Sequence, residues 1–170
     1  MSPKLRPFTL ADVDSLVRYA NNWNIARNLK DLFPHPYLEQ DARNFIEMAT
    51  RETPIHIFAI DLEGEAIGAI GIHPQSDIYR KNAELGYWLA EPYWGKGIMS
   101  SVIKEAVNFA FSTYDIDRVY AIPFGSNIAS QKVLEKNEFR LEGRLEGVLF
   151  KNGHLEDELI YAVRRDQLNL

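Results

Sequence analysis

One stretch, Tyr87 to Ser101, constrains this chain more than any other. It reads YWLAEPYWGKGIMSS, so an apolar run stops at Glu91-Pro92, and Gly95 and Gly97 follow just before a long amphipathic helix pattern. A strand that ends in a glycine-rich turn and leads into a helix gathers the N–H groups of the first helical turn at one point. The helix dipole favours an anion there. The stretch therefore predicts a phosphate cradle.

The two glycines fit neither common nucleotide-binding motif. The pattern GxxxxGK[ST] is absent, and the pattern GxGxxG begins at Gly95 and Gly97 but has Ser100 in place of its third glycine. The stretch also lies late in the chain, after a predicted hairpin, whereas a dinucleotide-binding unit needs a βαβ context. The glycines alone leave the identity of the anion open.

Composition excludes several classes of function. The 170 residues suit one domain, which we expect to span residues 1–170 with its own core. A net charge of -5 argues against a broad basic surface for nucleic acid. The absence of cysteine excludes a disulfide framework, a thiolate zinc site and a cysteine nucleophile. The four histidines show no metal-ligand spacing, so we predict no metal. The motif GxSxG is absent, so no Ser-His-Asp set is predicted.

The ends of the chain carry no membrane signal. The N-terminus, MSPKLRPFTLADVDSL, has no long apolar segment and contains acids early. No apolar run approaches the roughly 20 residues needed to span a bilayer. We expect a cytoplasmic protein that does not contact a membrane.

Apolar periodicity predicts alternating blocks of helix and strand. Turn sequences at Glu63-Gly64-Glu65 and Lys151-Asn152-Gly153 predict two hairpins. The order indicates a mixed α+β (α/β) fold with a largely antiparallel sheet, not a doubly wound one. Helices are predicted over 11–21, within 24–38, and over 38–51, 97–114 and 127–136, and strands over 4–9, 55–62, 66–73, 83–90, 118–124, 139–150 and 155–163.

Two motifs resemble one family. The segment Trp94–Met99 resembles the acetyl-CoA pyrophosphate loop of GNAT N-acetyltransferases, (R/Q)-x-x-G-x-(G/A). The closest likeness is to the branch that contains the ribosomal-protein N-terminal acetyltransferases. Its pattern of a Gly-Tyr-Trp strand followed by Pro-x-x-Trp-Gly-Lys-Gly is similar to Gly86-Tyr87-Trp88 and Pro92–Gly97. The segment Asn127–Phe139 is similar to that branch's N-x-x-S…V-L-E-K-x-G-F. Two motifs about 30 residues apart on the expected elements are more specific than one glycine pair.

The resemblance covers nearly the whole chain, but four positions depart from it. Trp94 stands where many relatives carry Arg or Gln, and Met99 stands where a small residue is usual. Glu138 replaces the usual glycine, so Asn137 or Glu138 must adopt the left-handed conformation at the end of the helix. Asn tolerates that conformation better than most residues. Leu134 occupies the place of a tyrosine that acts as general acid in many other GNAT enzymes.

The resemblance implies a GNAT fold with a mostly antiparallel, twisted sheet of about seven strands flanked by four or so helices. It implies acetyl-CoA as cosubstrate and direct transfer to a primary amine. The attacking amine must lose a proton, because amines with a pKa of about 8 to 10.4 are largely protonated at neutral pH. Glu84 is the candidate base, with a solvated or ion-paired strand acid as the alternative, and Ser130 is the candidate acid, with a surface hydroxyl as the alternative.

The remaining site residues follow from the same resemblance. Backbone N–H groups near the end of the strand before the loop would bind the oxyanion, and Asn127, three residues before Ser130, would hold the pantetheine amides. The acceptor would meet Glu84 and aromatic residues of the 24–38 region and its flank. The expected cofactor contacts are Trp88, Leu89, Ala90, Trp94, Gly95, Lys96, Gly97, Ile98, Met99, Ser100, Asn127 and Ser130, and the expected acceptor contacts are Trp23, Asn24, Phe33, His35, Tyr37 and Glu84.

The acceptor stays open at this point. The branch suggests a protein N-terminal amine, while a polyamine or an antibiotic amine is an alternative because one fold hosts many acceptors. A non-catalytic acyl-CoA-binding module is a second alternative, which Trp94, Met99 and Leu134 support, and a partner-binding scaffold is a third. We expect a monomer or a homodimer, since a strand edge near 139–163 could pair with a second copy.

Overall fold

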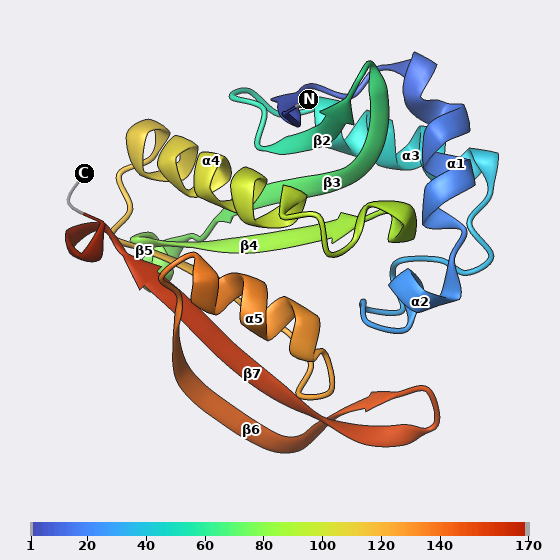
Figure 1. Ribbon diagram of the computed structural model, residues 1–170. Helices are drawn as coiled ribbons and strands as arrows, with labels where there is room; N and C mark the ends of the chain where they lie inside the picture. Colours follow the sequence, from blue (N-terminus) through green and yellow to red (C-terminus); the bar gives the residue numbers. More distant parts are fainter. Residues whose placement is uncertain (1, 169–170) are drawn as a thin grey trace. The chain divides into compact units, whose positions relative to one another are not determined.

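Helices and strands follow one another in the order expected from the sequence (Figure 1). The computed structural model describes residues 2–168. None of the helices in this range combines the length and the apolar content needed to cross a membrane. The strands are β1 (Lys4–Arg6), β2 (Ile57–Leu62), β3 (Glu65–Pro74), β4 (Asn82–Leu89), β5 (Arg118–Ala121), β6 (Arg140–Lys151) and β7 (His154–Arg164), and the α-helices are α1 (Val13–Ala20), α2 (Trp23–Ala26), α3 (Glu39–Thr50), α4 (Ile98–Thr113) and α5 (Ile128–Lys136).

The strands form one seven-stranded sheet in the order β1-β2-β3-β4-β5-β7-β6. The pairs β1–β2, β2–β3, β5–β7 and β6–β7 are antiparallel, while β4 and β5 are parallel, with Glu84 opposite Tyr120. The parallel pair is possible because α4 supplies the crossover between the two strands. The expected mixed, mostly antiparallel fold is confirmed.

The chain divides into two compact units. The first comprises Met1–Gly71 with Tyr87–Val102, and the second comprises Ile72–Gly86 with Ile103–Leu170. The expectation of a single domain over residues 1–170 stays a prediction.

The first unit is built around the apolar faces of α1 and α3. In α3, Ala42, Ile46 and Ala49 recur at helical spacing and are at most 4% exposed. They belong to one core cluster with Leu16 of α1 and Trp88 of β4. This core supports the end of β4, the strand that leads into the glycine turn.

Two tight turns form where the sequence predicts hairpins. Glu63 and Gly64 between β2 and β3 have φ of 58° and 90°, and Asn152 and Gly153 between β6 and β7 have φ of 54° and 82°. Consecutive positive φ angles match the right-handed twist of the flanking strands. Both predicted hairpins are confirmed.

The exit of α5 differs from the expectation. Glu138 has a φ of +65°, whereas Asn137 stays at -102° and its Nδ2 donates to the carbonyl O of Val133 at 2.8 Å. The Phe139 N–H returns to the carbonyl of Leu134 at 3.1 Å, which places the left-handed residue at position 138. Of the two residues that the sequence left open for this position, Glu138 adopts it, although Asn tolerates the left-handed conformation better.

Candidate active site

The backbone of the Gly95–Gly97 turn is open to approach. Gly95 and Gly97 have φ of +72° and +77°, and a Cβ atom added to either would meet no atom within 4 Å. Helix α4 starts directly afterwards, and its first backbone bond runs from the Ser101 N–H to the Gly97 carbonyl at 3.2 Å. The N–H groups of Ile98 and Met99 precede that bond. The turn can therefore receive an anionic group against its backbone, as a phosphate cradle requires.

Two hydrogen bonds hold the peptide group at the end of β4. The Ala90 N–H donates to the carbonyl of Ile67 at 2.8 Å, and the indole Nε1–H of Trp94 donates to the carbonyl of Leu89 at 2.7 Å. The Ala90 N–H is therefore already engaged with β3. Among the three residues expected to offer an oxyanion donor here, this leaves the N–H groups of Trp88 and Leu89 as the candidates.

The preceding residues of β4 lie unusually close to β3. A Cβ atom added to Gly68 would stand 2.4 Å from the carbonyl O of Trp88 and 3.1 Å from the Cα of Leu89. Only glycine allows this approach. Strand β3 therefore fixes where the end of β4 lies.

The turn before the glycines is held by α1 through a tyrosine pair. The Tyr93 ring meets the Tyr19 ring edge to face at 5.9 Å, and their hydroxyl oxygens are 3.4 Å apart. The Tyr19 hydroxyl donates to Glu65 at 2.9 Å. The hydrogen bond with Tyr93, then burial and the bond to Glu65, raise the pKa of Tyr19 to about 12. The Lys96 Nζ lies 5.4 Å from the centre of the Tyr93 ring, beside the glycine turn.

A carboxylate in the same turn is held by the start of α2. Glu91 accepts a hydrogen bond from the side-chain amide of Asn22 at 2.7 Å and from that of Asn24 at 3.1 Å. These two amides hold the pKa of Glu91 below its ordinary value, so the carboxylate is ionised at neutral pH. Asn24, expected to face the acceptor, therefore contacts the loop after β4.

The aromatic acceptor candidates fall into two groups. Trp23 is 48% exposed, and its ring lies 5.4 Å from that of His35. Phe33 packs 5.3 Å from Tyr37 and 6.0 Å from Trp88. Tyr37 is only 3% exposed and belongs to the core, so it packs in this structure, and its contact with the acceptor stays a prediction.

The second unit carries the other motif. Asn127 caps α5, and its Oδ1 accepts from the Ser130 N–H at 3.2 Å. Asn127 and Ser130 are thus adjacent, as their spacing predicts, although the Asn127 oxygen is used by the helix. Leu134 is fully buried, so it is a core residue and offers no acid.

Glu84 lies partly buried in β4, next to β5. Its neighbours in sequence, Ala83 and Leu85, are buried, so Glu84 points from the other face of the strand. Burial, then the charge of Glu84, raises the pKa of Tyr120, its partner in the parallel pair. The Arg118 guanidinium lies 4.7 Å from the centre of the Tyr120 ring.

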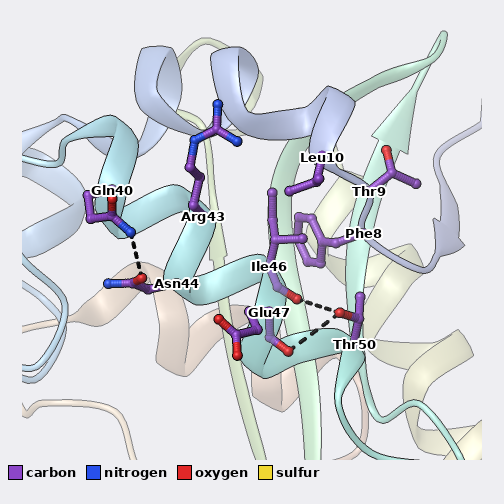
Figure 2. A pocket seen from close by; sticks show the side chains of 9 residues that line it. All are labelled: Phe8, Thr9, Leu10, Gln40, Arg43, Asn44, Ile46, Glu47 and Thr50. Atoms are coloured by element: carbon purple, nitrogen blue, oxygen red, sulfur yellow. Dashed lines mark hydrogen bonds between the residues drawn. The ribbon is translucent and has the colours of Figure 1, made fainter.

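A separate hollow of about 570 Å³ lies on α3 and the segment before α1 (Figure 2). None of the predicted site residues lines it. Its polar groups bond to one another or to the helix, as in the Gln40–Asn44 pair and the Thr50 hydroxyl on Ile46. Residues 2–168 contain no group of three or more His, Cys, Asp or Glu side chains arranged to hold a metal ion. The lining consists of Phe8, Thr9, Leu10, Gln40, Arg43, Asn44, Ile46, Glu47 and Thr50.

Sequence reasoning missed the residues that hold the loop. Tyr19, Asn22 and Glu65 contact the loop or its anchor, and their partners lie 46 to 74 residues away. No local pattern marks such contacts. The indole bond of Trp94 spans only five residues, but it depends on the turn geometry between Leu89 and Trp94.

Comparison with known proteins gives one consistent family. A sequence model of the acetyltransferase (GNAT) domain matches residues 4–140. The ribosomal-protein-serine acetyltransferase of Escherichia coli (strain K12) is 30% identical over 127 residues, which cover 73% of this chain and 70% of that protein. The uncharacterized N-acetyltransferase YoaA of Bacillus subtilis (strain 168) is 35% identical over 99 residues, 58% of this chain. That match spans 55% of YoaA, so the chain matches about half the length of this relative.

Solved structures agree with the fold. The acetyltransferase (GNAT family) from Bacillus anthracis has a TM-score of 0.84 at 21% identity, with 98% of this chain and 96% of that chain covered. RimL, a ribosomal L7/L12 alpha-N-protein acetyltransferase solved with coenzyme A, has a TM-score of 0.81 at 26% identity, with the same coverage of 98% and 96%.

Proposed function

Because the chain belongs to the acetyltransferase (GNAT) domain family, we propose that it transfers the acetyl group of acetyl-CoA to a primary amine. The observation that carries this proposal is the open Gly95–Gly97 turn at the start of α4. The two positive φ angles and the free space around both Cα atoms suit a pyrophosphate pressed against backbone N–H groups. A non-catalytic acyl-CoA-binding module would share the glycine turn but would not catalyse acetyl transfer.

The cofactor is assigned to residues of both motifs. The backbone of Gly95, Gly97, Ile98 and Met99 binds the pyrophosphate, and Lys96 adds a positive charge. The Nδ2 group of Asn127 donates to a pantetheine carbonyl, since its Oδ1 caps α5. The remaining cofactor contacts in the proposal are Trp88, Leu89, Ala90, Trp94, Ser100 and Ser130.

The proposed reaction is a direct transfer without a covalent enzyme intermediate. The amine nitrogen attacks the thioester carbonyl, a C–N bond forms, and the C–S bond breaks to release coenzyme A. Glu84 accepts the proton that the amine loses, and the Leu89 N–H donates to the oxyanion. Ser130 donates a proton to the leaving thiolate and regains one from solvent.

The proposed acceptor is a protein N-terminal amine. The support is the name of the Escherichia coli relative, a ribosomal-protein-serine acetyltransferase, and that of RimL, an alpha-N-protein acetyltransferase. Trp23 and Phe33, with Glu84, are the acceptor contacts in this proposal. An exposed indole such as Trp23 can pack against the first side chain of a peptide.

An acceptor screen tests the proposed reaction. Peptides with a free N-terminus, the same peptides with a blocked N-terminus, and spermidine are each incubated with acetyl-CoA, and thiol release is followed. We expect release only with free N-terminal peptides. Release with spermidine alone would move the acceptor to polyamines, and no release with any amine would favour the binding module.

Calorimetry tests the cradle with a matched pair of variants. Gly97→Val is expected to abolish acetyl-CoA binding, because a β-branched residue cannot hold a φ of +77° and its side chain would fill the cradle. Gly153→Val has the same strain, at a φ of +82°, in the turn between β6 and β7. It should bind acetyl-CoA normally. Normal affinity in the Gly97→Val protein would refute the assignment of the cradle.

A substitution in β4 tests the base. Glu84→Gln is expected to lower kcat by about 10²- to 10⁴-fold and to leave the Kd of acetyl-CoA unchanged. The amide keeps the size of the side chain but cannot accept the proton. A Glu84→Gln protein that keeps the wild-type kcat would remove Glu84 from this role.

A further inference from the structure

The end of β4 is held at two consecutive peptide groups. The peptide group that joins Leu89 to Ala90 is bonded at both ends, by the Trp94 indole at its carbonyl and by the Ile67 carbonyl at its N–H. The peptide group before it contains the Trp88 carbonyl and the Leu89 N–H, and it lies against Gly68, where no Cβ fits. The Leu89–Ala90 peptide group is therefore fixed by two hydrogen bonds, whereas the group before it is limited by β3 only in how closely it can approach Gly68.

Among these constraints, the hydrogen bond from the Trp94 indole is the one that comes from a side chain. Its Nε1–H lies 2.7 Å from the Leu89 oxygen, a short and well-formed bond, although the residue is 44% exposed. An exposed indole gains little from burial, so packing does not account for its position. The bond joins the last residue of β4 to the residue just before Gly95, across the turn at Glu91–Tyr93.

We propose that Trp94 is a positioning residue that orients the Leu89 N–H toward the reacting carbonyl by fixing the Leu89–Ala90 peptide group. This inference rests on the proposed acetyl transfer, in which the Leu89 N–H stabilises the oxyanion. A donor helps an oxyanion only when it is held in place before the reaction. Leu89 joins the two peptide groups, so a movement of the Leu89–Ala90 group displaces Leu89 and its N–H, and a misplacement of about 1 Å can cost a large factor in rate.

The first test measures the bond without any substrate. In Trp94→Phe, the aromatic ring remains and the N–H donor is lost. Exchange of the Ala90 amide hydrogen in the protein without acetyl-CoA is expected to become about tenfold faster, because one of the two bonds on its peptide group is gone. The Ser101 amide, bonded to Gly97 inside α4, serves as the internal control and should exchange at the wild-type rate.

The second test separates turnover from binding. In Trp94→Phe, kcat measured at saturating acetyl-CoA is expected to fall about tenfold, which a loss of cofactor affinity alone would not cause. Trp94→Gln restores an N–H donor on a side chain that can reach the Leu89 carbonyl, and it should recover part of both the kcat and the Ala90 protection.

The outcomes distinguish this inference from the proposed function. Unchanged Ala90 exchange in Trp94→Phe, or a Trp94→Gln protein as impaired as Trp94→Phe, overturns the positioning role. Faster exchange with normal kcat also overturns it, because the bond would then be structural. If the wild-type protein transfers no acetyl group, the proposed function fails, while the exchange experiment still reports on the bond.

Discussion

Glu138 adopts a backbone conformation that non-glycine residues disfavour. Its φ of +65° lies in the left-handed region, which costs a non-glycine residue about 1 kcal/mol or more. The exit of α5 nonetheless requires this conformation, because the Phe139 N–H bonds back to Leu134. The Glu138 side chain is exposed, and within residues 2–168 it makes no contact that compensates for the backbone strain.

Glu138→Gly is therefore expected to stabilise the protein by about 1 kcal/mol. Urea unfolding measures the change. The neighbouring Asn137→Gly is the matched control, and it should destabilise by about 1 kcal/mol, because residue 137 has a negative φ and its side chain bonds to Val133. A loss of stability in Glu138→Gly would contradict the strain.

Asp12 shows the opposite case, a buried charge that hydrogen bonds stabilise. Its side chain is 5% exposed and accepts hydrogen bonds from Arg6 at 2.7 Å and from the Thr9 N–H at 2.8 Å. Burial alone would raise the pKa of Asp12, but these bonds outweigh it and hold the pKa below its ordinary value. A lowered pKa means that the stabilisation is complete above the unfolded-state pKa of about 4 and is lost as the pH falls through the folded-state pKa.

Asp12→Asn is expected to cost about 2 kcal/mol at pH 7. The difference from wild type should shrink as the pH falls below about 4, because the wild-type protein then loses the same charge. Denaturant unfolding at several pH values measures this. Asp14→Asn removes an exposed charge two residues later, in the first turn of α1, and should stay within about 0.5 kcal/mol at every pH. A constant Asp12→Asn deficit down to about pH 2 would contradict the linkage.

Residue-level prediction from sequence succeeded where backbone chemistry decides. The sequence places Gly95 and Gly97 in a turn before a helix, and both have positive φ angles, which glycine tolerates. The sequence decides less where a side chain can either pack or bind. Tyr37 has the same aromatic character as Trp23, and only the packing of α1 and α3 determines that one is buried and the other exposed.

At the scale of elements, the close approach of β3 and β4 depends on one glycine. Gly68→Ala would bring a methyl group to 2.4 Å from the Trp88 oxygen, and backbone cannot yield as a flexible side chain would. We expect a loss of about 2 to 3 kcal/mol in the free energy of unfolding. Gly86→Ala in β4 is the control, since its Cβ would meet nothing within 4 Å, and it should change stability by less than about 0.5 kcal/mol. Equal effects of the two substitutions would refute the steric argument.

Elements were predictable because their signals are local. Periodicity and turn residues predict α4 and both hairpins within one or two positions of where they lie. The strand expected over 118–124 instead ends at Ala121, because Pro123 has no N–H to donate to a ladder. Pairing resumes only as a single bridge between Phe124 and Glu158. The parallel pairing of β4 with β5 depends on long-range order that no local pattern contains.

At the scale of the whole molecule, ligand binding should raise the free energy of unfolding. At acetyl-CoA concentrations of about 100 times the Kd, the folded protein gains about 2.7 kcal/mol. For a chain of this size, Tm is expected to rise by roughly 5 to 10 °C. Differential scanning calorimetry measures the shift. Gly97→Val should show no shift and Gly153→Val the full one, so an equal shift in both would place the ligand elsewhere.

The acceptor is the property of the whole molecule that the sequence leaves least determined. The proposed cradle uses backbone groups, which glycine positions reveal, whereas the proposed acceptor contacts are aromatic side chains, the exposed Trp23 and the partly buried Phe33. Such side chains look the same in sequence whether they pack or bind. Their arrangement depends on contacts between distant segments, such as Asn22 with Glu91.

The tyrosine pair beside the glycine turn removes one ionisable group from the range in which enzymes are assayed. Because the pKa of Tyr19 is raised to about 12, its hydroxyl is still protonated at neutral and moderately alkaline pH, where it bonds to Glu65 and Tyr93. In the proposed transfer, a change of rate with pH below about pH 10 would therefore come from groups other than Tyr19.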